Sequence, residues 1–107
     1  MKYKVIIDPQ AKLDLKEIYF YVAMNDTIQS ANKLLDALEE TCSRLEKIPE
    51  RGHIPPELGP TGIKRYLEIH YKPYRLIYEI EKNIIYIHCI LDGRRNIQEI
   101  LSNRLLR

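Results

Sequence analysis

The sequence predicts an α+β fold, in which an N-terminal strand and a helical hairpin precede a small antiparallel sheet and a short closing helix. Apolar residues recur at helical spacing in the first half of the chain and at a period of two over most of residues 66–91, and a segment rich in proline and glycine separates the two patterns. At 107 residues the chain fits a single domain, residues 1–107, with one buried core.

Composition limits the compartment and the kind of partner. Cys42 and Cys89 lie in apolar periodic segments, so we expect small buried side chains and neither a disulfide nor a metal site. No run approaches the ~20 apolar residues of a membrane span, which predicts a cytoplasmic protein without membrane contact. Residues 1–60 carry eight Lys or Arg against ten Asp or Glu, net −2, whereas residues 61–107 carry nine against five, net +4. The positive charge of the second half therefore suits an acidic partner or a phosphate backbone.

The first half of the chain is predicted to form one strand and two helices. Apolar residues alternate over residues 3–7, and the strand ends at Asp8 and Pro9, which suit the cap and the first position of a helix. We expect helices over about 9–24 and 27–47, separated by the "NDT" break. Their apolar stripes comprise Ala11, Leu15, Ile18 and Val22, then Ile28, Ala31, Leu35, Leu38, Cys42 and Leu45.

The second half is predicted to form a sheet. Residues 49–62, "PERGHIPPELGPTG", contain four prolines and three glycines and are expected to form a loop. Three strands with period two follow, and "NIQEILSNRLLR" suits a short closing helix. One sheet face, which should meet the helices, carries Leu67, Ile69, Tyr71, Leu76, Tyr78, Ile80, Ile85, Ile87, Cys89 and Leu91. The other is expected to be open and mainly polar, with Tyr66, Glu68, His70, Arg75, Ile77, Glu79, Tyr86, His88 and Ile90.

Three segments in this order, "PERGHIPPELG", "YRLIYEI" and "ILDGRR", make nearly the whole chain resemble the RelE/ParE superfamily of toxins, and within it the ParE-like branch. The resemblance implies the toxin of a bacterial type II toxin–antitoxin module of the plasmid-stabilisation kind, silenced by a small antitoxin with an acidic binding segment. Members resembling ParE inhibit DNA gyrase by binding, whereas members resembling RelE cleave messenger RNA in the ribosome. A third alternative is a degenerate member that binds an antitoxin without being toxic.

The residues that the resemblance would require for RNA cleavage are only half present. Enzymes resembling RelE use lysines on the strand before "YRL", the arginine of that segment, an arginine after the last strand and a nearby tyrosine to move protons and stabilise charge. Arg75 and Arg95 match this set. Tyr66 and Glu68 stand near the lysine positions, and Leu101 stands near the tyrosine position.

A second nuclease set, in the style of other superfamily members, combines a carboxylate, an arginine and a histidine. Those members carry a terminal histidine where this chain has Gly93. A simpler interpretation treats the histidines as polar residues of a solvated strand face, with Arg75 paired across strands to Glu68 or Glu79. The residues available for the second set are Glu57 or Glu68, Arg75, and His70 or His88.

The last strand ends at "DGRR", which places two adjacent guanidinium groups at one edge of the sheet. We interpret this edge as a binding surface and predict a gyrase inhibitor that needs no cofactor and no metal. Enzymatic activity is not expected, although the messenger endonuclease remains the alternative. The predicted target-binding residues are Arg75, Arg94, Arg95, Tyr66 and Tyr86. If the chain is a nuclease, its catalytic residues are expected to be Arg75, Arg95, His70, His88 and Glu68.

Overall fold

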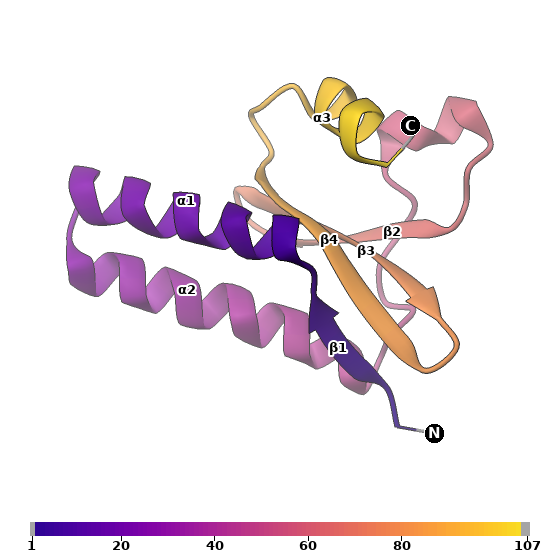
Figure 1. The fold of residues 1–107 in the computed structure, drawn as a ribbon, viewed down its shortest axis with the longest axis horizontal. Coiled ribbons are helices and arrows are strands. Elements are labelled where there is room, and N and C mark those ends of the chain that lie inside the picture. The colour runs from indigo at the N-terminus through magenta and orange to yellow at the C-terminus, as the bar shows by residue number, and fades with distance from the viewer. Residues whose placement is uncertain (1, 106–107) are drawn as a thin grey trace.

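The computed structural model describes residues 2–105 and confirms the α+β fold (Figure 1). Two 3₁₀ helices, η1 (Arg44–Glu46) and η2 (Pro56–Thr61), interrupt the segment between the helical hairpin and the sheet. None of the helices in the described part of the chain is long and apolar enough to cross a membrane. The remaining elements are β1 (Lys4–Ile7), α1 (Pro9–Asn25), α2 (Ile28–Ser43), β2 (Tyr66–Tyr71), β3 (Tyr74–Glu81), β4 (Ile84–Asp92) and α3 (Ile97–Arg104).

The helices begin where capping residues satisfy their first N–H groups. Asp8 precedes α1 and accepts a hydrogen bond from the Ala11 N–H at 2.9 Å, and Thr27 caps α2 in the same way. The α-helical part of α2 ends at Ser43, earlier than predicted, because the chain tightens into the 3₁₀ turn η1. The proline-rich loop also contains more regular structure than expected, since η2 lies within it.

The sheet has the order β1–β4–β3–β2. Strands β2, β3 and β4 form an antiparallel meander, whereas β1 lies parallel to β4, with Val5 opposite Ile85. The hairpin α1–α2 connects β1 to the meander, and β1 forms one edge of the sheet (Figure 1). The periodicity of the sequence did not specify this position of β1.

Strand β4 contains a β-bulge at His88. Ile77 of β3 lies opposite Cys89 of β4. The next residue of β3, Tyr78, lies opposite Ile87, so His88 has no partner of its own in the ladder. Because of this extra residue, each side chain of β4 after His88 points to the face opposite to the one that simple alternation would give.

The bulge makes the predicted alternation of β4 wrong beyond His88. Cys89 and Leu91 were expected on the face that meets the helical hairpin, and Ile90 on the opposite face. In the structure Ile90 packs into the core beneath the hairpin. Cys89 and Leu91 instead pack on the second face, beside Ile77.

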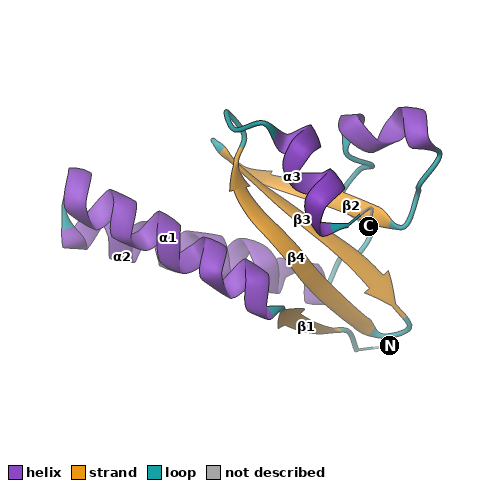
Figure 2. Cartoon of the chain, turned by 45° about the horizontal axis from the view of Figure 1, so that its top comes forward, coloured by secondary structure: helices purple, strands orange, loops and turns teal. Residues whose placement is uncertain are grey.

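Both faces of the sheet are covered, so the expectation that the second face is open is also wrong (Figure 2). Its apolar end requires cover and receives it from η2 and α3, which bury Leu58, Ile97 and Leu101 there. On the first face α1 and α2 pack with the sheet, as predicted, and Ile18 and Leu35 lie partly buried against this core. The buried members of the first core are Ala11, Leu15, Leu38, Cys42, Leu45, Ile69, Leu76, Tyr78, Ile85, Ile87 and Ile90.

Candidate functional site

On the second face of the sheet, two carboxylates converge on the guanidinium group of Arg75. Arg75 donates to Glu68 through Nε at 2.8 Å and through one terminal nitrogen at 2.6 Å. It also donates to both oxygens of Glu57, at 2.7 and 2.6 Å. The Glu68 side chain is fully buried, and those of Arg75 and Glu57 are 14% and 23% exposed. We call Arg75, Glu57 and Glu68 the arginine cluster.

Strand register and one close contact build the arginine cluster. His70 on β2 lies directly opposite Arg75 on β3, and Glu68 shares their face because it precedes His70 by two residues. Glu57 comes from the first turn of η2. A Cβ at Gly93 would lie 2.9 Å from a backbone oxygen and 3.3 Å from Cδ of Arg75, so this glycine lets the turn after β4 approach the arginine stem.

The charged groups of the arginine cluster pair with one another. Burial alone would raise the pKa of Glu68, but hydrogen bonds from Arg75 and His70 outweigh desolvation and hold this pKa below the ordinary glutamate range. The hydrogen bonds from Arg75 likewise lower the pKa of Glu57. With one cation and two anions, the cluster carries a net charge of about −1 at neutral pH. The two carboxylates thus occupy four of the five N–H donors of the Arg75 guanidinium, which leaves little of it available to a phosphate group.

His53, which the sequence did not single out, lies beside Glu68. The two residues exchange backbone hydrogen bonds of 3.1 and 2.7 Å in an isolated antiparallel bridge. The loop can come this close because Gly52 has no side chain: a Cβ there would lie 2.6 Å from the Glu68 carbonyl oxygen and 2.7 Å from the Tyr78 hydroxyl. Nitrogen and oxygen atoms of His53, Glu68 and His70 lie within 4.8 Å of one another, so these three residues could hold a metal ion.

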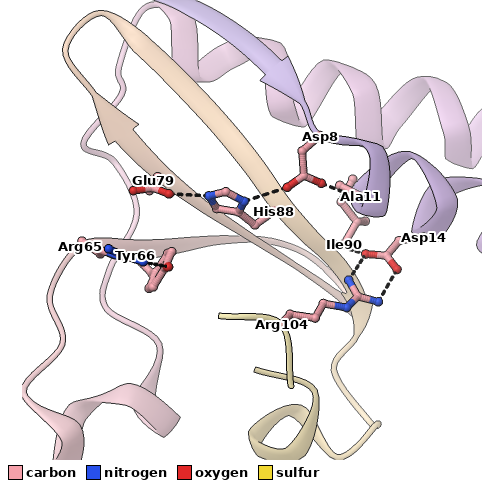
Figure 3. Close-up of polar contacts among 9 residues, drawn as sticks. All are labelled: Asp8, Ala11, Asp14, Arg65, Tyr66, Glu79, His88, Ile90 and Arg104. Carbon is pink, nitrogen blue, oxygen red and sulfur yellow. Dashed lines mark hydrogen bonds and ion pairs between the residues drawn. The ribbon is translucent and has the colours of Figure 1, made fainter. Parts of the chain in front are cut away.

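His88 belongs to a different group (Figure 3). Its Nδ1 lies 2.8 Å from Asp8 and its Nε2 lies 2.6 Å from Glu79, so both ring nitrogens face a carboxylate. The rings of Tyr66 and Tyr86 lie 5.8 and 6.4 Å from the imidazole. Of the residues named for a nuclease, the structure therefore brings Glu68, His70 and Arg75 together and gives His88 other partners. Of the two cross-strand partners predicted for Arg75, the structure shows Glu68. The other, Glu79, contacts His88 instead.

The residues predicted to bind a target differ in accessibility. Tyr66 is only 3% exposed, and Arg65 donates to its hydroxyl and lies over its ring (Figure 3). Tyr86 is half-buried. Arg94 is exposed but paired with Asp92, whereas Arg95 is exposed and forms no ion pair with any other residue of the range 2–105.

Arg94 and Arg95 line a pocket between the end of β4 and α1. The pocket has a volume of about 280 Å³ and is also lined by Tyr21 and Ile18 of α1 and by Tyr74 of β3. Arg75 points into the arginine cluster, so the three predicted arginines do not form one continuous surface.

A partly buried ion pair, which was not predicted from the sequence, connects α1 to α3 (Figure 3). Arg104 donates to both oxygens of Asp14 at 2.7 and 2.8 Å, and the Ile90 N–H donates to Asp14 at 3.0 Å. Asp14 is 3% exposed. The available signal was a charged residue on the apolar stripe of α1, between Ala11 and Leu15, because a buried charge requires a partner.

Comparison with known proteins identifies similar chains. The family model described as "ParE toxin of type II toxin-antitoxin system, parDE" matches residues 5–97. Toxin ParE3 of Caulobacter vibrioides is 28% identical over 91 residues, which are 85% of this chain and 87% of that protein.

Solved structures share the fold. A chain of the chromosomal ParDE toxin–antitoxin system from P. aeruginosa superposes with a TM-score of 0.69 at 16% identity, covering 83% of this chain and 94% of that one. A mutant of the E. coli toxin RelE in its free state superposes with a TM-score of 0.67 at 14% identity, covering 100% of this chain and 98% of that one. The fold is thus common to proteins of both names.

Proposed function

This chain belongs to the ParE toxin family of type II toxin–antitoxin systems, and we propose that it inhibits DNA gyrase by stoichiometric binding until an antitoxin neutralises it. Gyrase inhibition and messenger cleavage are the two candidate modes of action, and this fold is compatible with both. Because the fold is similar to that of RelE as well as to that of a ParDE chain, the choice depends on side chains at the site.

The arginine cluster carries the proposal. A nuclease of the RelE kind needs Arg75 free to stabilise a phosphorane, but here four hydrogen bonds commit this guanidinium to Glu57 and Glu68. The lysine and tyrosine positions of that nuclease set are also unsuited to RNA. Tyr66, Glu68 and Leu101, which stand near the lysine and tyrosine positions, are all buried. These contacts favour an inhibitor over an enzyme.

We place the gyrase-binding surface at the end of β4, where Arg94 and Arg95 border the pocket on α1. Exposed guanidinium groups beside apolar and aromatic side chains are common anchors of protein interfaces. Deleting the chain from residue 96 onward would not test this surface cleanly, because Ile97 and Leu101 are buried in the second core cluster. Point substitutions at the two exposed arginines are the better probe.

The deciding experiment compares two purified targets. The protein should inhibit DNA supercoiling by gyrase in proportion to its concentration, and ribosomes programmed with messenger should remain uncut at every codon. The double variant Arg94→Ala, Arg95→Ala should inhibit at least about tenfold less, the loss of one to two interface anchors. Arg44→Ala is the matched control, because Arg44 is exposed on η1 and, within residues 2–105, its one ion-pair partner is Glu40.

Two outcomes would contradict the proposal. Codon-dependent cleavage of messenger, lost when His70 and His88 are both replaced by glutamine, would establish the enzyme instead. No effect on either target, together with retained antitoxin binding, would establish the degenerate member. In cells, induction should stop DNA synthesis before protein synthesis.

For the antitoxin, we propose a segment that folds on α1 and extends into the pocket at the end of β4. Several large apolar side chains of α1 are exposed, with Tyr21 at 67% and Met24 at 84%, which suits an amphipathic partner. Arg95 at the pocket rim suits acidic residues in that partner. Tyr21→Asp with Met24→Asp should abolish co-purification with the antitoxin from the native operon. The control Lys33→Asp, at an exposed position of α2, should retain it.

A further inference from the structure

A group of nitrogen and oxygen donors lies at the β2 edge of the sheet, outside the surfaces proposed above. His53 and Glu68 lie side by side in an isolated β-bridge, and His70 follows Glu68 by two residues on the same face. The rings of His53 and His70 are 5.3 Å apart between centroids, inclined at 76°. Backbone register, and not chance contact of long side chains, therefore brings two imidazoles and one carboxylate to one place.

We propose that His53, Glu68 and His70 form a binding site for a divalent transition-metal ion, with Zn²⁺ the expected cation. Zinc binds imidazole nitrogen and carboxylate oxygen at about 2.0–2.2 Å, so the donor atoms of a tetrahedral site lie roughly 3.4 Å apart. Here the donor atoms all lie within 4.8 Å of one another, and Nε2 of His70 is 2.5 Å from Oε1 of Glu68. A cation bound by these two atoms would replace the hydrogen bond between them.

Metal binding requires small rotations of His53 and His70, the two exposed donors. His53 is exposed and the His70 side chain is 44% exposed, so each ring can rotate by the small amount needed. Glu68 is fully buried, and two hydrogen bonds from Arg75 fix its carboxylate. Ligating carboxylates in metal sites are commonly oriented by such outer hydrogen bonds. The fixed acid and the two adjustable histidines thus form a partly preorganised site.

The local charge favours a cation despite the nearby arginines. Arg75 is outnumbered by Glu57 and Glu68, which leaves one negative charge beside the histidines. Arg44 and Arg51 line a pocket together with His53, Glu68 and His70. Arg44 is paired with Glu40, and both of these arginines are exposed, so solvent screens their charges.

The donor set also indicates the class of metal. Imidazole ligands suit Zn²⁺, Ni²⁺ and Cu²⁺, whereas Mg²⁺ and Ca²⁺ prefer oxygen alone. The three donors leave one coordination position directed to a pocket of about 230 Å³, which has room for water. A bound ion would tie the loop at His53 to strand β2.

The test is calorimetric titration of the tag-free full chain with Zn²⁺, which should bind one equivalent. His53→Gln and His70→Gln should each weaken binding at least about tenfold, since even outer-shell substitutions cost 10–100-fold. His88→Gln, at the remaining histidine of the chain, should leave the affinity unchanged. In the unmodified protein, Zn²⁺ should shift the imidazole ¹⁵N resonances of His53 and His70 but not those of His88. This measurement identifies the histidine ligands without any substitution.

A cobalt spectrum distinguishes this site from the two cysteines. Co²⁺ should give visible d–d bands without the near-ultraviolet charge-transfer band of a thiolate ligand. Absence of saturable binding, equal affinity in the His53 and His70 variants, or a thiolate band would each overturn the proposal. These measurements do not depend on toxicity, so their failure would leave the gyrase proposal unaffected.

Discussion

Replacing Arg75 by alanine should lower the free energy of unfolding by about 3–5 kcal/mol at neutral pH, the range measured when one partner of a buried ion pair is removed. The substitution deletes four hydrogen bonds to two carboxylates. Glu57 is 23% exposed and can be hydrated again, but Glu68 is fully buried and keeps only His70. Most of the loss should therefore arise from the unpaired charge of Glu68.

A second substitution tests that assignment. Adding Glu68→Gln to Arg75→Ala removes the unpaired charge, so the double variant should be more stable than Arg75→Ala alone. Glu57→Gln by itself should cost about 1 kcal/mol or less, the usual value of a solvent-accessible pair. Urea unfolding followed by far-ultraviolet circular dichroism measures all four proteins. A loss below about 1 kcal/mol for Arg75→Ala, or a double variant less stable than the single one, would refute this account.

The pH dependence provides a further test. In the folded protein the pKa values of Glu57 and Glu68 are lowered, so in acid the folded state binds fewer protons than the unfolded state. Their stabilisation should be complete above the unfolded glutamate pKa of about 4.3 and should be lost as the pH falls through the lower folded values. In Arg75→Ala burial should instead raise the pKa of Glu68. The stability difference between the two proteins should therefore narrow on acidification.

Three further predictions concern packing and thiol reactivity. Leu38→Ala, at a fully buried position, should cost about 2–5 kcal/mol in urea unfolding, whereas Leu13→Ala, at a 51% exposed position, should cost little. Gly52→Ala should cost about 1–3 kcal/mol because its Cβ meets backbone and hydroxyl oxygens, and Gly59→Ala, whose added Cβ would point into open space, should not show this clash penalty. Burial raises the pKa of Cys42 to about 12 and that of Cys89 to about 11, so iodoacetamide at pH 8 should modify them only after denaturation, as mass spectrometry would show.

Local sequence was sufficient to predict the helices and most of the sheet. The Asp8–Pro9 pair places the start of α1 because capping and a fixed proline φ act within one turn. Period-two alternation places β2 and β3 for a similar reason, since neighbouring side chains on a strand point to opposite faces. These features need no information about distant residues.

The candidate site was predicted less completely, because its contacts join distant segments. Glu68, His70 and Arg75 were expected on one face through strand periodicity, and that part is confirmed. The bidentate contact of Glu57 with Arg75 depends on how η2 packs, and the position of His53 depends on the close approach of the loop to β2. Neither distance is encoded in local periodicity or composition.

By itself the sequence determined the order and type of the elements, because apolar spacing, caps and breakers act over a few residues. The tertiary structure decided which charges meet. The bulge at His88 reverses the facing of the residues after it, so Cys89 and Leu91 join the second face, where they pack with residues of α3 and where Leu91 lies opposite Arg75. A guanidinium that the sequence left available to a target is thereby committed to Glu57 and Glu68, since buried charges are stable only when they are paired.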